Sequence, residues 1–419
     1  MFVLDIPPTT RRRNDAFRPT FPSTRLRLLL QHHINCLQLH FLEKEGAEKQ
    51  EINDVPDPDP FTNVSKHHVF EGRRTKEKNN HKFTTMASQT QETIYKTLES
   101  LLPTVSNPSL GNSVIPSLLL SIQRVAEALR SNKTISAAGT ANAFGDDQLN
   151  VDVQAENIIR ETLAACPAVV TASSEEDPKE VSTRTNDGST TSNDGEEYTV
   201  SFDPLDGSSI IAPNWTVGTI IGIWRGSSAL NSPPATEQIA SILGVFGPRT
   251  TAIVAWRTPG NSIPSLCFEV GLSASTCEIV RPSVSLASPP FKTRYFAPAN
   301  LRAAAEDERY AALISKYISD KYTLRYCGGL VPDVVHALVK GHGVYVSPVT
   351  EASKAKLRRM YELAPLALIV ECAGGRAVDP ATGKDVLATE IGDCDERGGL
   401  VCGTREEVDR VCEAFGLQG

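Results

Sequence analysis

The sequence predicts an α/β protein in which helices and β-strands follow one another along the chain. Apolar residues repeat at helical spacing after Pro116, which indicates an amphipathic helix with proline in its first turn. In residues 198–202 large side chains alternate with small ones in a β-rich run, which indicates a half-buried strand. With 419 residues, the chain is long enough for one large or two medium domains.

The other elements follow from the same patterns, with Gly-rich and Pro-rich breaks between them. A loop rich in glycine and polar residues is expected over residues 139–147. The apolar helical pattern around residues 334–339 favours a structural role for His336. The elements expected are helix 116–129, helix 157–163, strand 168–172, strand 198–202, and strands 216–224, 250–256 and 266–270.

Composition excludes several classes of protein. Residues 1–86 hold 14 Lys/Arg and 11 Asp/Glu, which leaves 28 and 39 for the remainder, a body with a net charge of −11. Such an acidic body is a poor partner for nucleic acid. No apolar run approaches the roughly 18 residues that a membrane span needs, so no membrane partner is expected. The nine cysteines are scattered without a Cys-x-x-Cys pair, which favours a reducing compartment over a zinc or disulfide framework.

Histidine is scarce in the acidic body. Six of the eight histidines precede residue 87, and only His336 and His342 follow it. Mechanisms that need a histidine base therefore have few candidates, whereas carboxylate and metal chemistry has many.

Residues 1–85 are expected to be a disordered, dispensable extension. The segment is polar, with an Arg-rich start that weakly resembles a transit peptide, and Met86 begins a stretch that looks like a normal protein start. A cytoplasmic location is preferred; import into a plastid or mitochondrion is the alternative if the segment is a real transit peptide.

The strand at residues 198–202 leads to two acidic residues. Pro204 and Gly207 are expected to end it in a tight turn that holds Asp203 and Asp206. Two carboxylates three residues apart repel each other unless a cation lies between them, and hard oxygen ligands suit Mg²⁺ or Mn²⁺. The small residues at 207–209 could bring backbone N–H groups close to a phosphate. The simpler alternative is that Asp-Pro and Asp-Gly pairs merely form turns.

The run Ser-Phe-Asp-Pro-Leu-Asp-Gly-Ser-Ser at residues 201–209 resembles the signature of the fructose-1,6-bisphosphatase family. Residues 216–224 and 247–251 resemble its sedoheptulose-1,7-bisphosphatase branch more closely, and the resemblance covers about residues 100–415. It implies a sugar-phosphatase fold of alternating α-β-α-β-α layers. The implied halves are a metal- and phosphate-binding half, 86–280, and a sugar-phosphate-binding half, 281–419. Residues 179–196 are rich in Ser, Thr, Asn, Asp and Gly and are expected to be a disordered surface insertion within the first half.

The resemblance also implies an activity and a set of site residues. It implies a Mg²⁺-dependent phosphatase that removes the 1-phosphate of sedoheptulose-1,7-bisphosphate or fructose-1,6-bisphosphate, with two or three Mg²⁺ ions (Mn²⁺ possible) and a homodimer or homotetramer. The implied metal ligands are Glu175, Glu176, Asp203, the Leu205 carbonyl, Asp206 and Glu362; the residues that activate water or assist it are Asp152, Glu176 and Asp146; and the substrate contacts are Asp206, Gly207, Ser208, Ser209, Asn300, Arg325, Tyr326, Lys356 and Arg358.

Departures from the family leave the sugar open. Fructose-specific members carry Asn-Ile-Asp where this chain has Ile-Ile-Ala at residues 210–212, and a Tyr where it has Ser347. A metal phosphatase for inositol phosphates or phosphoadenosine nucleotides, and a non-catalytic sugar-phosphate sensor, stay as alternatives. Glu197 replaces a cation that contacts AMP in the family, and Cys166 and Cys267 stand alone. Insensitivity to AMP and to thiol reductants is therefore expected.

Overall fold

A computed structural model describes residues 90–102, 107–141, 147–184, 195–258, 265–274 and 276–417. The expected extension 1–85 and the loop residue Asp146 lie outside these ranges. No helix within them is long and apolar enough to cross a membrane.

An eight-stranded sheet is built from residues before 282. Its strand order is β10-β9-β8-β7-β6-β5-β3-β4, and all neighbours are antiparallel except β3 and β5. The strands are β3 Val169–Ser174, β4 Val181–Ser182, β5 Tyr198–Asp206, β6 Val217–Arg225, β7 Gln238–Phe246, β8 Thr250–Trp256, β9 Leu266–Leu272 and β10 Cys277–Arg281.

Helices α3 and α4 cover one face of this sheet. Helix α3, Ile115–Ser131, starts with Pro116 and buries nearly every apolar side chain of its first three turns. Helix α4, Asn150–Ala164, packs beside it, and both contribute to one apolar core with the sheet. A short hairpin, β1 Ala137–Ala141 and β2 Asp147–Leu149, joins them, and a π-helical turn, η1 Leu110–Val114, precedes α3.

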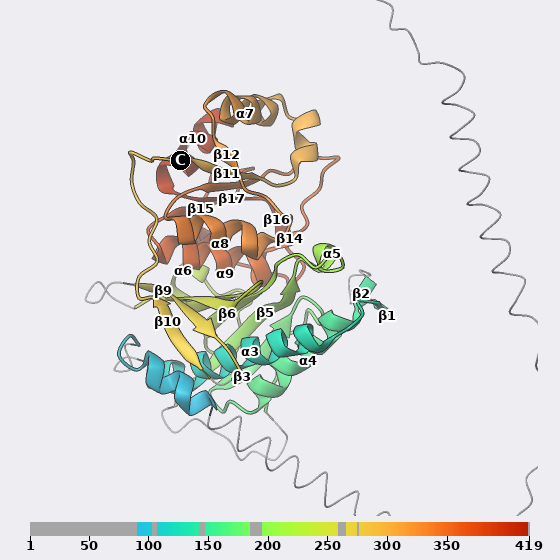
Figure 1. Ribbon diagram of the computed structural model, residues 1–419, viewed down its shortest axis with the longest axis vertical. Helices are drawn as coiled ribbons and strands as arrows, with labels where there is room; N and C mark the ends of the chain where they lie inside the picture. Colours follow the sequence, from blue (N-terminus) through green and yellow to red (C-terminus); the bar gives the residue numbers. More distant parts are fainter. Residues whose placement is uncertain are drawn as a thin grey trace, which may run out of the picture. The chain divides into compact units, whose positions relative to one another are not determined.

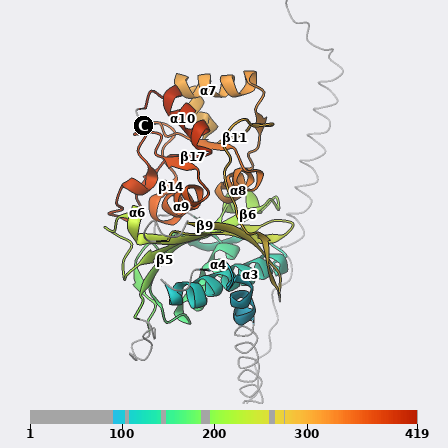
Figure 2. The same ribbon diagram turned by 90° about the vertical axis from the view of Figure 1, so that its left-hand side faces the viewer.

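A second sheet and four helices complete the layers (Figures 1 and 2). Helices α8, Leu330–Lys340, and α9, Ala364–Cys372, lie between the sheets, and α7, Glu308–Ser319, and α10, Arg405–Ala414, cover the outer face. The predicted α-β-α-β-α layering is therefore confirmed. The second sheet has the order β12-β11-β13-β17-β15, with β11 Tyr295–Pro298, β12 Thr323–Leu324, β13 Val344–Ser347, β15 Arg376–Val378 and β17 Leu400–Gly403.

The remaining short elements connect these layers. They are α5 Ser208–Ile211, α6 Pro234–Glu237, η2 Leu301–Ala305, β14 Leu357–Arg358, η3 Arg359–Leu363, η4 Val386–Ala388 and β16 Arg397–Gly398. Strand β14 pairs with β16. The chain from 357 to 363 therefore runs as this short strand and then as the π-helical turn η3.

Three local expectations need correction. Pro204 does not end the central strand: β5 continues to Asp206, because the register shifts between Asp203 and Asp206 and this irregularity accommodates the missing N–H. Part of the expected loop at 139–147 forms the β1–β2 hairpin. Within the expected insertion 179–196, β4 pairs with β3, while residues 185–194 lie outside the described ranges.

Candidate active site

Three buried carboxyl groups meet at the end of β5. Asp203 and Asp206 come from that strand and Glu362 comes from η3, and each offers an oxygen within 4.8 Å of the others. Backbone amides orient them, since Leu205 N donates to Asp203 Oδ1 at 2.9 Å and Arg358 N donates to Glu362 Oε2 at 2.5 Å. Buried carboxylates this close can hold a divalent cation, so the donor set fits the metal that the sequence predicts.

A fourth carboxylate and one arginine complete the cluster. Glu175 follows β3, where its N–H donates to the Phe202 carbonyl at 3.0 Å. Arg358 is only 2% exposed and forms ion pairs with Glu175 and, at 3.5 Å, with Asp395. Arg358 thus lies among the predicted metal ligands as well as beside the predicted substrate contacts.

Burial and mutual repulsion shift the protonation of the cluster. The pKa of Asp203 is raised well above its usual value by burial and by the charges of Glu175, Asp206 and Glu362. Burial likewise raises the pKa of Glu362, and it raises that of Asp206 to about 6 against the opposing backbone hydrogen bonds. Nearby positive charge would relieve all three, which is the electrostatic signature of a cation site.

The cluster lines a cavity of about 340 Å³. The predicted phosphate-binding residues face the same space as the carboxylates, and three cationic side chains join them. The lining comprises Glu175, Asp203, Leu205, Asp206, Gly207, Ser208, Ser209, Gly328, Lys356, Leu357, Arg358, Glu362 and Arg397. Acidic and basic groups from distant parts of the sequence are therefore brought to one pocket.

A second cavity, of about 310 Å³, adjoins the first. The two cavities share Asp206, Ser209, Gly328, Lys356 and Leu357. The second also contains the predicted substrate contacts Asn300 and Tyr326, together with Ser347 and two cations that the sequence did not single out, Arg302 and Lys354. The sequence offered little signal for these two, because an isolated Arg or Lys normally indicates solvated surface.

Two predicted catalytic carboxylates lie next to the first cavity without lining it. Asp152, in the first turn of α4, is 3% exposed and accepts a hydrogen bond from Leu149 N at 2.9 Å. Burial raises the pKa of Asp152 to about 7, with smaller contributions from the charges of Glu176 and Glu175. Glu176 accepts a hydrogen bond from Gln148 Nε2 at 2.5 Å.

One predicted substrate contact points elsewhere. The Arg325 guanidinium lies 5.8 Å from the centre of the Tyr295 ring and donates to the Leu324 carbonyl at 2.8 Å. It lines neither cavity of its own chain. The role of Arg325 as a substrate contact therefore stays a prediction of the family resemblance.

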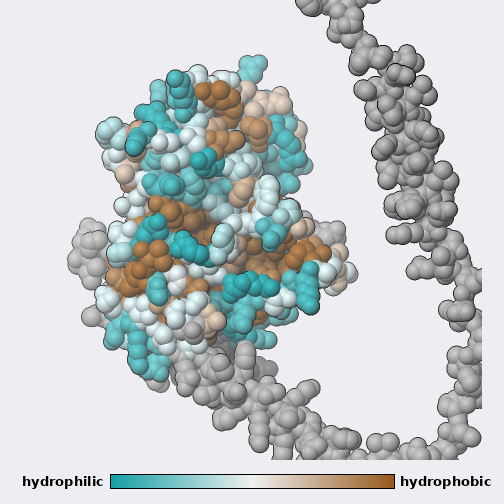
Figure 3. All heavy atoms as spheres, viewed as in Figure 1, coloured by the Kyte–Doolittle hydropathy of each residue, from teal (hydrophilic) through white to brown (hydrophobic). Residues whose placement is uncertain are grey.

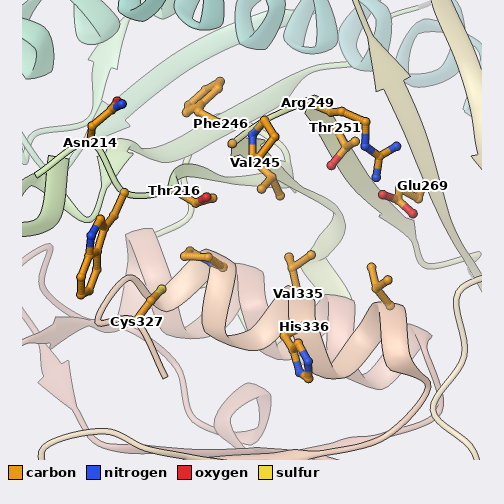
Figure 4. Close-up of a pocket in the computed structure, with 15 residues that line it drawn as sticks. Asn214, Thr216, Val245, Phe246, Arg249, Thr251, Glu269, Cys327, Val335 and His336 are labelled. Atoms are coloured by element: carbon orange, nitrogen blue, oxygen red, sulfur yellow. The ribbon is translucent and has the colours of Figure 1, made fainter. Parts of the chain in front are cut away.

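A larger cavity of about 880 Å³ lies between α8, the residues just before β6, and strands β7, β8 and β9 (Figure 4). Apolar side chains also gather at the level of α8 on the surface in Figure 3. The one carboxylate that lines this larger cavity, Glu269, is paired with Arg281. Cys327 also lines it, and its neighbours in sequence, Tyr326 and Gly328, line the second cavity. Size alone therefore does not make it the active site, since the metal-type cluster found in the described residues is elsewhere.

Two family models match the chain. The model for the N-terminal domain of fructose-1,6-bisphosphatase matches residues 110–269, and the model for its C-terminal domain matches residues 290–416. Together they cover the residues that line both cavities.

Individual relatives agree with this match. A chloroplastic sedoheptulose-1,7-bisphosphatase from Chlamydomonas reinhardtii is 36% identical over 75% of this chain and 76% of its own length. A class 1 fructose-1,6-bisphosphatase from Syntrophotalea carbinolica is 34% identical over 66% and 80%, respectively. A crystal structure assigned as sedoheptulose-1,7-bisphosphatase from Toxoplasma gondii is 34% identical, covers 77% of this chain and 98% of its own, and has a TM-score of 0.67. The chain therefore belongs to the fructose-1,6-bisphosphatase family, and it is a phosphoric monoester hydrolase of the sugar-bisphosphatase type.

Proposed function

We propose that this enzyme removes the 1-phosphate from a ketose bisphosphate, with sedoheptulose-1,7-bisphosphate as the preferred substrate and fructose-1,6-bisphosphate as a slower one. The proposal also assigns two or three Mg²⁺ ions to each site, with Mn²⁺ as a substitute.

The observation that carries the proposal is the junction of the two cavities. One contains four carboxylates, the other contains Arg302, Lys354 and the Tyr326 phenol, and Lys356 lines both. Cationic side chains bind a phosphate directly, whereas carboxylates bind it only through cations. A substrate with a phosphate at each end matches this pair of environments.

The side chains divide the reaction between them. Glu175, Asp203, Asp206, Glu362 and the Leu205 carbonyl would hold the metal ions, which when bound neutralise phosphoryl charge and lower the pKa of water. Asp152 and Glu176 would orient the attacking water and accept its proton. The water oxygen forms a new bond to phosphorus as the bond to the sugar oxygen breaks, and the products are the sugar monophosphate and inorganic phosphate.

The phosphate-binding residues have a separate role. The N–H groups of Gly207, Ser208 and Ser209 would hold the phosphate that is cleaved, and Asn300, Tyr326 and Lys356 would hold the distal one. Arg358, which is already paired with carboxylates, would balance charge at the junction.

Two observations support sedoheptulose over fructose. Ser347 lines the distal cavity, and its small side chain leaves room that a tyrosine would fill. The Chlamydomonas relative, named as a sedoheptulose enzyme, is also 36% identical, against 34% for the Syntrophotalea fructose enzyme.

Steady-state phosphate release with Mg²⁺ tests the proposal. We expect the highest kcat/KM on sedoheptulose-1,7-bisphosphate, a lower value on fructose-1,6-bisphosphate, and negligible turnover of inositol monophosphate and phosphoadenosine phosphate. Faster turnover of either of the last two would move the enzyme to the alternative class. Binding of the bisphosphates without turnover would indicate the non-catalytic sensor.

Assembly and location are proposed more coarsely. We propose a homodimer or homotetramer, which sedimentation of the full chain would test.

A cytoplasmic location is proposed, with organelle import as the alternative because the Chlamydomonas relative is chloroplastic. Imaging a fluorescent protein fused to residues 1–85 distinguishes the two locations.

A further inference from the structure

The first turn of α8 connects the two cavities through backbone hydrogen bonds. Leu330 N donates to Asp206 Oδ1 at 3.1 Å, and Val331 N donates to Asp206 Oδ2 at 2.7 Å. In the same turn, Asp333 accepts hydrogen bonds from Cys327 N at 2.7 Å and Gly328 N at 3.0 Å. The helix therefore holds the metal-binding carboxylate through its own amides and the preceding loop through the Asp333 side chain.

The loop that Asp333 holds forms part of the distal cavity. Tyr326 and Gly328 line that cavity, and Gly328 also lines the acidic one. Gly328 has a φ of 97°, which only glycine adopts readily. Such a backbone needs partners for its amides, and the Asp333 carboxylate accepts two consecutive N–H groups of this loop.

Packing supports the same loop from the opposite side. An added Cβ atom at Gly328 would lie 3.5 Å from Ile210 Cγ2, and one at Gly329 would lie 3.2 Å from Ile210 Cδ1. Ile210 belongs to α5, directly after the phosphate-binding residues. The loop thus lies between Ile210 and Asp333, and it is Asp333, not Ile210, that makes polar bonds to the amides of Cys327 and Gly328.

Asp333 does not line either cavity and is 6% exposed. Each of its oxygens accepts one backbone N–H, so its hydrogen bonds act on a ligand through the loop, while its charge also acts on Asp206 and Tyr326. Asparagine would keep one acceptor and turn an NH₂ group toward the other amide, whereas alanine would leave both buried amides unsatisfied.

We propose that Asp333 is a positioning residue for the distal phosphate, because it fixes the backbone from Tyr326 to Gly328 that forms the wall of the distal cavity. The inference rests on the proposed function, since it assigns one phosphate of the substrate to each cavity. It predicts that Asp333 matters for substrates with a distal phosphate and matters much less for those without one.

The test compares fructose-1,6-bisphosphate with fructose 1-phosphate, with Mg²⁺ and the full chain. For Asp333→Ala we expect KM for the bisphosphate to rise by roughly tenfold or more, while kcat for the bisphosphate stays within about threefold of wild type. The kcat/KM for fructose 1-phosphate should also stay within about threefold of wild type. The KM of Asp333→Asn for the bisphosphate should lie between those of Asp333→Ala and wild type. The ratio of the two kcat/KM values is measured in one preparation, so a partly unfolded variant still gives an answer.

Asp307→Asn is the matched control. Asp307 also uses its carboxylate to accept a backbone N–H at a helix start, from Arg309 at 2.9 Å, but it lines neither cavity. For Asp307→Asn, the ratio of kcat/KM on fructose-1,6-bisphosphate to kcat/KM on fructose 1-phosphate should equal that of wild type. Equal losses of Asp333→Ala on both substrates, a loss in kcat alone, or no change would each overturn the inference. A wild-type chain inactive on every sugar phosphate would instead remove the proposed function, and the inference with it.

Discussion

At the scale of single residues, the acidic site depends on hydrogen bonds that point carboxylates toward one another. Asp206 accepts two N–H groups from α8, and Asp203 and Glu362 each accept one from a neighbouring residue. These bonds fix like charges in place before any cation is bound, at a cost in stability that a cation can offset. Ligand geometry is therefore built into the backbone, which limits how far the site can relax.

The stability of the metal-free protein should fall as pH rises through the acid range. Asp206 has a folded-state pKa raised from 3.8 to about 6, and the pKa values of Asp203 and Glu362 are raised too. At pH values between the unfolded-state pKa and the raised folded-state pKa, the folded protein holds protons that the unfolded chain has released. The free energy of unfolding therefore declines as pH rises through this range. We expect Mg²⁺ to raise the melting temperature more at pH 7.5 than at about pH 5.

Thermal melts in EDTA and in Mg²⁺ at each pH measure this difference. Glu362→Gln should show a smaller dependence of the Mg²⁺ effect on pH, because one ionising group is gone. A larger Mg²⁺ effect at the acid end would contradict the sign of the pKa shifts.

At the scale of elements, the sequence predicted those whose pattern is local. Helix α3 has a proline start and a helical repeat of apolar residues, and β5 has a β-rich run, so both were predictable. Strand β7 was not predicted, although it lies in the middle of the first sheet. Its Gln238, Ser241 and Gly244 interrupt the apolar run. They are tolerated because Gln238 Nε2 donates to Ser241 Oγ at 2.8 Å, and because Gly244 leaves room for Ile122 of α3, which an added Cβ would approach to 3.0 Å.

The site was predictable where a contiguous motif carried it. The turn at residues 201–209 predicted the two carboxylates that meet in the first cavity, and the resemblance added Glu175 and Glu362 from distant segments, which line the same cavity. The distal side depends on tertiary contacts, since Arg302 reaches the cavity from η2 and Lys354 reaches it from a separate loop. No local pattern marks such residues, which explains why they were missed.

Close packing of α8 on β6 should be essential for the site. An alanine Cβ at Gly218 would lie 2.4 Å from the Cβ of Val331, the residue whose N–H binds Asp206. We expect Gly218→Ala to cost about 1–3 kcal/mol of stability and to lower kcat/KM, because the first turn of α8 must shift. Melting curves and steady-state kinetics measure both effects.

Gly271→Ala is the control for that substitution. Its added Cβ would meet only a Val280 methyl, at 3.1 Å, and Val280 is 37% exposed and can yield. Similar losses in both variants would show that the contact with α8 is not special.

The start of β5 should not bind AMP. Glu196 accepts hydrogen bonds from Ser109 N and the Tyr198 hydroxyl, at 2.9 and 2.8 Å, and Glu197 is paired with Arg184 at 2.7 Å. A nucleotide phosphate would meet two carboxylates here and be repelled. We expect phosphate release to be unchanged by micromolar AMP, and strong inhibition would disprove this.

Dithiol should also leave the rate of phosphate release unchanged, since the cysteines in the described ranges are free thiols.

At the scale of the whole molecule, the five layers put the site where segments from both family domains meet. Strand β5 ends beside the first turn of α8, and β14 and η3 bring Lys356, Arg358 and Glu362 to the same place. The second sheet carries Ser347 on β13, which lines the distal cavity. A bisphosphate that spans the two cavities would therefore contact both domains at once.

Residues 1–85 should be dispensable for folding and catalysis. The family models begin at residue 110, and the elements that build both cavities lie after it. We expect a protein that starts at Met86 to keep the melting temperature and turnover of the full chain. A melting temperature several degrees lower would show that the segment packs on the body.

The most direct test of the central claim is phosphate release from sedoheptulose-1,7-bisphosphate as Mg²⁺ is removed and restored. Activity should vanish in chelator and return with Mg²⁺ or Mn²⁺, and Asp206→Asn should lose at least ~10³ of the rate at saturating Mg²⁺ because a charged ligand is gone. Turnover that persists in chelator, or near-wild-type turnover of Asp206→Asn, would contradict the assignment of the acidic cavity as the catalytic metal site.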